Sequence, residues 1–236
     1  MKTIHVYISL ALIIAIFRHE RLAYISIGCT ENIITNILIG ITKMEITVKQ
    51  VTPWSRALNA ARWTCGKDAL DKEPSDIFKI NAMMSPHSPK RLVEYDIKIK
   101  GIPYCNAVHF VRHHIGVEKF QCSLRDDRNE EIDDRRKLPQ DYPVNLWMAL
   151  NADALINISL VRLCHQADAT TRKIWAIVRQ RVYEIDPIVA RFMVRSCVFR
   201  GFCPEAPEKC CGYVLSKAFR SALENYRNGF VQHLDF

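Results

Sequence analysis

The chain has 236 residues, of which 49% are hydrophobic, and a formal net charge of +8. This length fits one domain with at most a small appendage, and it allows a substantial core. No run of Lys and Arg and no basic-aromatic interleaving marks a nucleic-acid groove, so the composition argues against a nucleic-acid partner. The moderate positive charge suits small anionic ligands, and phosphate-bearing cofactors are the simplest of these.

The first 43 residues differ from the rest of the chain. An almost uninterrupted apolar run from Val6 to Phe17 lies behind Lys2 and is followed by the charged segment 18–21. The run looks like the hydrophobic part of a signal sequence, but it is too short to span a bilayer and has no clear small-x-small cleavage site. We therefore interpret residues 1–43 as an extension, or as a start assigned too far upstream, and expect no membrane association.

The remaining chain has a mixed α and β pattern. Segments 44–51 and 93–100 have strand character, and segments 55–64, 104–114, 145–166 and 170–185 have helical periodicity. The helix predicted over 170–185 ends at Asp186-Pro187. Its apolar stripe predicts core packing and consists of Ile174, Ile177, Val178, Val182 and Ile185.

The densest set of reactive side chains is Arg112-His113-His114, followed after seven residues by Cys122-Ser123-Leu124-Arg125. Cationic, hydrogen-bonding and nucleophilic groups this close together point to an anionic ligand. An alternating segment up to Lys100, a Gly101-Ile-Pro103 turn and an apolar run over 104–111 precede them. The sequence therefore predicts that a strand, a turn and a helix carry Arg112 to a helix end.

Asn151 and Arg162 are eleven residues apart, about three helical turns, so one helix would present both on one face. A carboxamide and a guanidinium would then face the same cavity. Guanidinium groups bind phosphate through two parallel charge-assisted hydrogen bonds. The candidates for this contact are Arg112, Arg125, Arg135 and Arg162.

The spacing resembles the signature of the flavin-dependent thymidylate synthases, which is Arg-His-Arg, seven residues and Ser. Here it reads Arg-His-His, seven residues and Cys. The resemblance covers roughly residues 44–195, and Met44 to Lys49 resembles the strand with which family members begin. Further segments match at the distances of the family: His87-Ser88-Pro89, His109, Arg135 with Leu138-Pro139, Asn151 to Leu155, and Leu160 to Arg162.

The resemblance implies an α+β fold of the thymidylate synthase-complementing-protein type, with helices packed on a small, mainly antiparallel sheet. It also implies a homotetramer whose active sites form between subunits and share flavin adenine dinucleotide (FAD). Such enzymes reduce the flavin with NADPH, take the methylene group of methylenetetrahydrofolate and deliver it to dUMP, giving dTMP. Because the flavin supplies the hydride, the task of the protein is positioning and electrostatics.

The same resemblance implies roles for individual residues. Flavin contacts would come from His87, Arg112, His113, His114, Asn151 and Asn157. Nucleotide contacts would come from His109, Cys122, Ser123, Arg125, Arg135 and Arg162. Cys122 and Ser123 would lie near the pyrimidine, and together with Arg162 they are the candidate catalytic residues.

Three positions depart from the family pattern. His114 replaces the second Arg of the signature, so a constant charge becomes one that depends on pH. Cys122 replaces Ser, although Ser123 and Arg125 restore a Ser-x-Arg ending if the loop shifts by one residue. Asp153 stands where many members have a basic residue. The nine residues between Arg125 and Arg135 also predict a compact form, because family members usually have a long helical insertion there.

Other functions remain open at this point. An enzyme on the same scaffold could modify a pyrimidine nucleotide differently, for example by hydroxymethylation. A non-catalytic nucleotide- or nucleic-acid-binding relative with a zinc-stabilised tail would contain metal and no flavin. A Cys122 thiolate beside His113 or His114 could be a nucleophile in its own right, but the sequence places no orienting Asn or Asp for a Cys-His hydrolase.

Nine cysteines without an accepted signal sequence predict a reducing, cytoplasmic location, where thiols are ligands, catalysts or small buried hydrophobes. Four of them lie in the predicted C-terminal tail, residues 196–236, around a Gly- and Pro-rich loop. Three of these four, together with one on the preceding core helix, could close a tetrahedral zinc site of Cys164, Cys197, Cys203 and Cys210. The spacing lacks the Cys-x-x-Cys knuckle, so buried or free thiols are the alternative.

Overall fold

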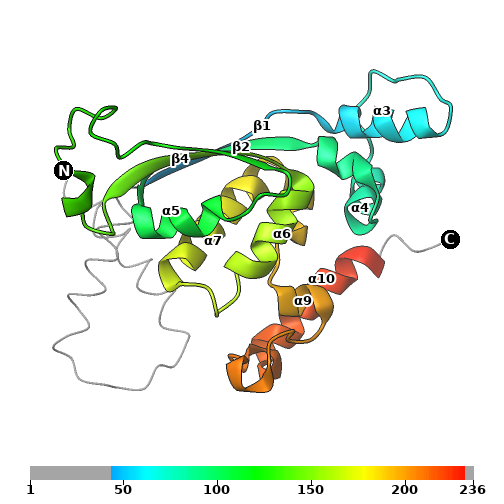
Figure 1. The fold of residues 1–236 in the computed structure, drawn as a ribbon. Helices are drawn as coiled ribbons and strands as arrows, with labels where there is room; N and C mark the ends of the chain where they lie inside the picture. Colours follow the sequence, from blue (N-terminus) through cyan, green and yellow to red (C-terminus); the bar gives the residue numbers. More distant parts are fainter. Residues whose placement is uncertain (1–43, 232–236) are drawn as a thin grey trace, which may run out of the picture. The chain divides into compact units, whose positions relative to one another are not determined.

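The computed structural model describes residues 44–231, so the extension predicted over residues 1–43 lies outside the described residues. Four strands form one antiparallel sheet in the order β1-β2-β4-β3. They are β1 (Glu45–Gln50), β2 (Glu94–Pro103), β3 (Val117–Gln121) and β4 (Pro143–Asn151). Helices pack on one face of this sheet (Figure 1). The predicted α+β class, with helices on a small antiparallel sheet, is confirmed.

The helices fall into three groups along the chain. Before β2 lie α3 (Trp54–Thr64), α4 (Asp76–Met84) and the short 3-10 helix η1 (Ser88–Leu92). Between the later strands lie α5 (Tyr104–Val111) and η2 (Arg135–Lys137). After the sheet come α6 (Ala152–Arg162), α7 (Ala169–Ile185), α8 (Pro187–Phe192), α9 (Ser196–Arg200), η3 (Pro207–Lys209), η4 (Tyr213–Leu215) and α10 (Lys217–Val231).

The single helix predicted over 145–166 is wrong in its first part. Residues up to Asn151 form β4, and the helix begins only at Ala152. Within β4 every second side chain is buried, namely Val144, Leu146, Met148 and Leu150. This period of two fits a strand, and pairing with β2 on one side and β3 on the other satisfies the β4 backbone.

β3 was not predicted, and the helix predicted over 104–114 ends three residues early. The helix α5 has Arg112 as its C-cap, and the chain then turns through Gly116, whose φ is +68°, into β3. β3 is a five-residue edge strand in which only Val117 is buried, so its sequence has little of the alternation that marks a strand.

The predicted helix over 170–185 is confirmed as α7, and its stripe packs against the sheet and α5. Ile174, Val178 and Val182 are fully buried, whereas Ile185 at the helix end is 42% exposed. Trp175 stacks on Phe110 of α5 with ring centroids 5.5 Å apart, and its Nε1 donates to Ser159 Oγ of α6 at 2.8 Å. This contact fixes α5, α6 and α7 relative to one another.

Later helices continue from α7 into the tail. Cys197 and Val198 of α9 are buried in the same core as the sheet residues, and α10 packs on α9. The domain boundary predicted at 195/196 stays a prediction. In the part of the chain from 44 to 231, no helix is both long and apolar enough to cross a membrane.

Candidate functional site

The turn from Arg112 to Gly116 lies between the end of α5 and the start of β3, as the sequence predicted for a helix end. Arg162, the last residue of α6, contacts this turn. Its Nε donates to His113 Nε2 at 3.0 Å, and its Nη2 donates to the carbonyl oxygen of His109 at 2.6 Å. An imidazole nitrogen that accepts a hydrogen bond carries no proton, so His113 has its proton on Nδ1.

The charge state of His113 follows from its surroundings. Burial and the nearby charges of Arg162 and Lys119 lower the pKa of this imidazole to about 4. Burial and the charge of Arg112 also lower the pKa of Arg162, although a guanidinium stays protonated at any physiological pH. At pH 7 the site therefore combines a neutral ring with fixed cations.

Lys119 of β3 belongs to this site although the sequence did not reveal it. Its Nζ donates to the carbonyl oxygen of His113 at 2.6 Å and lies 3.0 Å from His114 Nδ1. Because β3 was not predicted and Lys119 belongs to no motif, no pattern in the sequence indicated that this lysine is part of the site. We call the residues Arg112, His113, His114, Lys119 and Arg162 the α5–β3 cluster. Its three constant cations favour an anionic ligand.

His109 lies on the side of α5 that faces α7. Asp168 caps α7, and its carboxylate accepts hydrogen bonds from Thr171 N and Asn106 Nδ2, each at 2.8 Å. Burial acts to raise the pKa of Asp168, but these hydrogen bonds and the charge of His109 outweigh it and hold the pKa below its usual value. An ionised carboxylate is thus available to orient His109, and neither Asp168 nor Asn106 was a candidate from sequence.

Asn151 is the last residue of β4 and the N-cap of α6, where its Oδ1 accepts from Ala154 N at 2.9 Å. It therefore does not lie inside the helix that ends at Arg162. Its backbone N–H donates to the carbonyl oxygen of Gly116 at 3.2 Å. Asn151 and Arg162 stand at the two ends of α6, and both contact the segment from His109 to Gly116.

Replacing Gly116 with alanine is expected to destabilise the protein by about 2–4 kcal/mol. A residue with a Cβ is strained at φ +68° by about 1–2 kcal/mol, and the added Cβ would lie 2.6 Å from Asn151 Nδ2. Displacing that cap costs about 1 kcal/mol more. Urea unfolding measures the loss. Gly66→Ala is the matched control, because φ is +67° there and an added Cβ meets nothing within 4 Å. Equal losses in the two variants would contradict the proposed clash.

The low pKa of His113 predicts a pH dependence of stability. Between pH 6.5 and about 4 the unfolded chain binds a proton at this ring that the folded chain does not, so stability falls as the pH drops through this window. The full shift corresponds to about 3 kcal/mol, which we discount to about 1–2 kcal/mol because the ring is only half-buried.

Urea unfolding at pH 7.5, 6.0 and 4.5 tests this prediction. The matched variant is His113→Gln, whose amide oxygen can accept from Arg162 but does not titrate. It should lose less stability than the parent chain between pH 6.5 and 4. Identical losses in the two chains would show that His113 does not titrate as described.

The second half of the signature lies at the other end of β3. From Val117 to Cys122 the strand extends about 17 Å at about 3.3 Å per residue. Cys122 is exposed, and Arg125 is held by Asp127 through hydrogen bonds of 2.8 and 2.5 Å. Within one chain, therefore, Cys122, Ser123 and Arg125 are not brought to the α5–β3 cluster.

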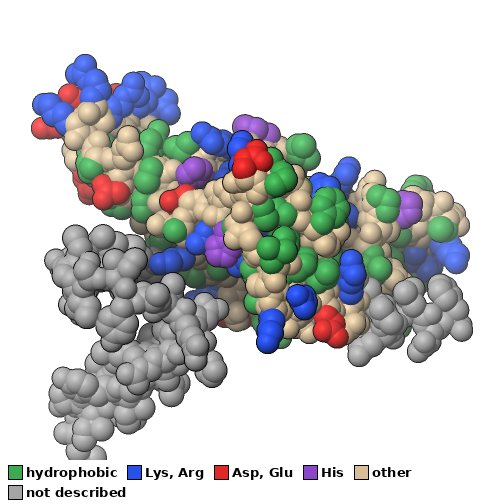
Figure 2. Space-filling view, turned by 90° about the horizontal axis from the view of Figure 1, so that it is seen from below, with side chains coloured by type: hydrophobic (Ala, Val, Ile, Leu, Met, Phe, Trp, Pro, Cys, Tyr) green, Lys and Arg blue, Asp and Glu red, His purple; other side chains and the backbone are tan. Residues whose placement is uncertain are grey.

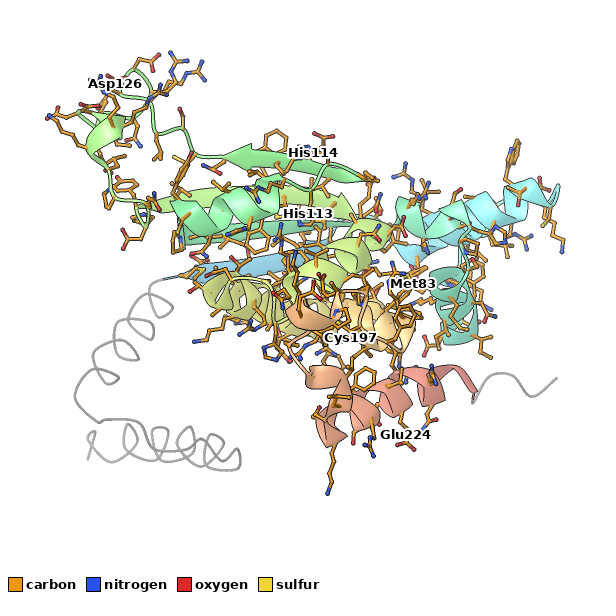
Figure 3. The ribbon with its side chains drawn as sticks, turned by 60° about the horizontal axis from the view of Figure 1, so that its bottom comes forward. Met83, His113, His114, Asp126, Cys197 and Glu224 are labelled. Carbon is orange, nitrogen blue, oxygen red and sulfur yellow. The ribbon has the colours of Figure 1, made fainter. Side chains whose placement is uncertain are left out.

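Three other candidates also lie apart from the cluster. His87 is the N-cap of η1, Asn157 is in the middle of α6, and Arg135 begins η2; all three are exposed. Asp126, in the same loop as Arg135, lies well away from His113 and His114 (Figure 3). Over residues 44–231 no hydrogen bond joins these three side chains to the cluster.

The structure explains how an acidic residue is accommodated at position 153, where the flavin-dependent synthases often have a basic one. This carboxylate, in the first turn of α6, lies 3.3 Å from Lys90 Nζ and 3.3 Å from Arg91 Nε of η1. Lys90 is buried and also donates to the carbonyl oxygen of Ser85 at 3.0 Å. The acid at 153 is thus balanced by two cations that follow His87 in the chain. Lys90 and Arg91 were not candidates from sequence. Their position directly after His87-Ser88-Pro89 is the pattern that could have drawn attention to them.

The predicted convergence of cysteines is present, but the structure does not support the zinc site. The thiols of Cys164, Cys197, Cys203 and Cys210 line one pocket of about 200 Å³. Burial and the neighbouring Cys164 raise the pKa of the Cys197 thiol. Yet among residues 44–231 no three His, Cys, Asp or Glu side chains are arranged so that they could hold a metal ion. Protonated thiols pack as small hydrophobes, which accounts for the pocket without a metal.

The chain resembles known proteins in its structure rather than in its sequence. No protein-family model and no curated protein matches the chain. Its fold, however, is similar to that of a solved structure. The chain is similar to the flavin-dependent thymidylate synthase ThyX of Helicobacter pylori complexed with FAD and dUMP, with a TM-score of 0.51 and 13% identity. The match covers 64% of this chain and 100% of that one.

Two further solved structures match with lower TM-scores. A second structure of ThyX from Helicobacter pylori with FAD and dUMP has a TM-score of 0.47 and 16% identity, covering 62% of this chain and 99% of that one. The UMP/dUMP methylase PolB from Streptomyces cacaoi, bound with 5-Br dUMP, has a TM-score of 0.49 and 15% identity, covering 67% and 96%. At 13% identity the likeness to the first of these structures establishes the fold alone.

Proposed function

We propose that this protein is a flavin-dependent thymidylate synthase that methylates dUMP to dTMP with methylenetetrahydrofolate and NADPH. The observation that supports this most is the α5–β3 cluster, which sets three constant cations around a neutral imidazole. FAD and dUMP both carry phosphate, and guanidinium and ammonium groups are the protein groups that bind it. The likeness in fold to a synthase solved with both ligands is consistent with this assignment.

The residues present fit a flavin. Arg112 is an exposed cation at the end of α5, and His113 has an N–H on Nδ1 to donate while Arg162 holds its other nitrogen. We assign Arg112, His113 and His114 to the flavin, with His87 beside the Lys90-Arg91 pair as a further contact. When bound and reduced, the flavin supplies the hydride and carries the one-carbon group. The residues of the chain therefore have to orient the ligands and stabilise their charges.

Arg162 and His109 are assigned to the nucleotide. Arg162 donates hydrogen bonds from Nε and Nη2 to His113 and His109, so its guanidinium is oriented before any ligand binds. This orientation reduces the conformational entropy that binding would otherwise cost. We propose that His109, which interacts electrostatically with the ionised Asp168, donates to an acceptor on the nucleotide.

The separation along β3 supports active sites formed between subunits. One chain offers Arg112 to His114 at one end of the strand and Cys122 to Arg125 at the other, about 17 Å away. We propose that in a homotetramer the Cys122-Ser123-Leu124-Arg125 segment of one subunit completes the site at the α5–β3 cluster of another. Cys122 and Ser123 would then face the pyrimidine. Multi-angle light scattering of the full chain tests the assembly, and a monomer that is active would overturn it.

A product assay tests the proposed reaction. The full chain is supplied anaerobically with FAD, NADPH, methylenetetrahydrofolate and dUMP, and the nucleotide products are identified by mass. Formation of dTMP supports the proposal. A product of another mass would assign a different pyrimidine modification, and an absence of bound flavin would favour a nucleotide-binding protein without this catalysis. Either of these outcomes would overturn the synthase assignment.

A further inference from the structure

A second basic surface lies on the side of α7 opposite its buried stripe. A groove of about 1220 Å³ runs between α7 on one wall and α8, α9 and α10 on the other. On α7 the lining residues Arg172, Ala176, Arg179 and Tyr183 are four, three and four positions apart, which places them on one helix face. The groove shares no residue with the α5–β3 cluster. Figure 2 shows the molecule from below, with separate Lys and Arg side chains among hydrophobic ones.

The groove is strongly biased in charge. One acid, Asp76, lines it. Against this acid stand five cations, namely Arg172, Lys173, Arg179, Arg191 and Arg195. A cleft lined by charges of one sign concentrates ions of the opposite sign. None of these cations was singled out in the sequence, because they are spread over 24 positions and form no run.

The cations of the groove differ from the other arginine of the α7 surface in their ion pairing. Across residues 44–231, Arg172, Lys173, Arg179 and Arg195 form no ion pair with a carboxylate. Arg181, on the same helix but outside the groove, is paired with Glu184 at 3.0 Å. Arg172 and Arg179 donate instead to backbone carbonyl oxygens, so the charge of these four groove cations is not neutralised by a carboxylate, whereas that of Arg181 is.

Arg195 is the most rigidly held of these cations. Its guanidinium stacks over the ring of Tyr213, 4.3 Å from the ring centroid, which fixes its plane. Its Nη1 is buried and has no hydrogen-bond partner in the described part of the chain. A buried donor without a partner is costly, so the positive charge of Arg195 at this position is not offset by a hydrogen-bond acceptor on Nη1.

We propose that this groove binds a small ligand with two or more phosphate groups, separately from the proposed flavin and nucleotide site. Planar guanidinium groups on both walls match phosphate oxygens, and the exposed Tyr183 offers a ring on which a base can stack. The wall from Arg172 to Tyr183 is about 16 Å long, since eleven residues rise about 1.5 Å each. That length suits a ligand of nucleotide or dinucleotide size rather than a long nucleic-acid strand.

The test uses tripolyphosphate as the probe and the full chain labelled with ¹³C at alanine methyl groups. Ala176 and Ala222 line opposite walls of the groove, so their methyl resonances report binding there and nowhere else. They should shift saturably on titration. Arg179→Gln and Arg195→Gln should each weaken this binding tenfold or more, whereas the matched control Arg181→Gln should change it less than twofold. Arg162→Ala should leave it unchanged, which separates this test from that of the proposed function.

Three outcomes would overturn the proposal. An absence of shifts at Ala176 and Ala222 would show that the groove does not take phosphates. A loss of binding in Arg181→Gln as large as in the groove variants would show that only net charge matters. Tighter binding of a single-stranded RNA 20-mer than of tripolyphosphate, measured by the same methyl shifts, would replace the small ligand with a nucleic acid.

Discussion

Replacing Arg162 with alanine is expected to weaken dUMP binding by about 10²- to 10⁴-fold. Two charge-assisted hydrogen bonds from a guanidinium to a phosphate are worth about 1.5–3 kcal/mol each, and about 1.4 kcal/mol corresponds to a factor of ten. The substitution also releases His113 Nε2 and the carbonyl oxygen of His109, which Arg162 now holds. Isothermal titration calorimetry with dUMP measures the change in affinity.

Two further variants make this result interpretable. Arg162→Lys keeps the charge but loses the fork of donors, so it should fall between the parent chain and Arg162→Ala. Arg181→Ala removes an exposed arginine that pairs with Glu184, and it should leave dUMP affinity unchanged. Unchanged affinity in a folded Arg162→Ala protein would remove this arginine from the nucleotide site.

The second large effect is expected at Asp186, which is 5% exposed. Its Oδ2 accepts from Trp54 Nε1 and from Tyr95 OH, each at 2.7 Å, and its Oδ1 accepts from Val189 N at 3.0 Å. Asp186→Ala leaves three donors without a partner in the core and removes the cap of α8. We expect a loss of about 3–5 kcal/mol in the free energy of unfolding and a fall of roughly 10 °C in melting temperature.

Urea and thermal unfolding measure this loss. Asp127→Ala is the control, since it breaks an exposed pair with Arg125 and should cost less than about 1 kcal/mol. Asp186→Asn keeps the size and one acceptor oxygen, so it should be less damaging than alanine. A loss under about 1 kcal/mol for Asp186→Ala would mean that water replaces the carboxylate.

The elements that the sequence predicted correctly are those with a strong local pattern. The stripe through Ile174, Val178 and Val182 predicted α7, and the apolar run over 104–111 predicted that Arg112 lies at a helix end. The turn predicted at Gly101-Ile-Pro103 is wrong, because these residues are the end of β2, where a register shift interrupts the pairing with β4. These predictions depend on spacing along the chain alone. Short apolar runs are ambiguous between strand and helix, and for that reason the helix predicted over 145–166 included β4 as well as α6. β3 was missed because its sequence has no apolar run and little alternation.

The sequence by itself determined which chemistry the site could hold, because Arg112, His113 and Arg162 are cationic or hydrogen-bonding wherever they lie. Only the tertiary structure decided which of the candidates meet. Arg162 reaches His113 across 49 positions, and Lys119 enters because β3 returns alongside β4. Cys122 is carried away by the same strand. Such contacts depend on how helices pack on the sheet, and no local pattern along the chain encodes that packing.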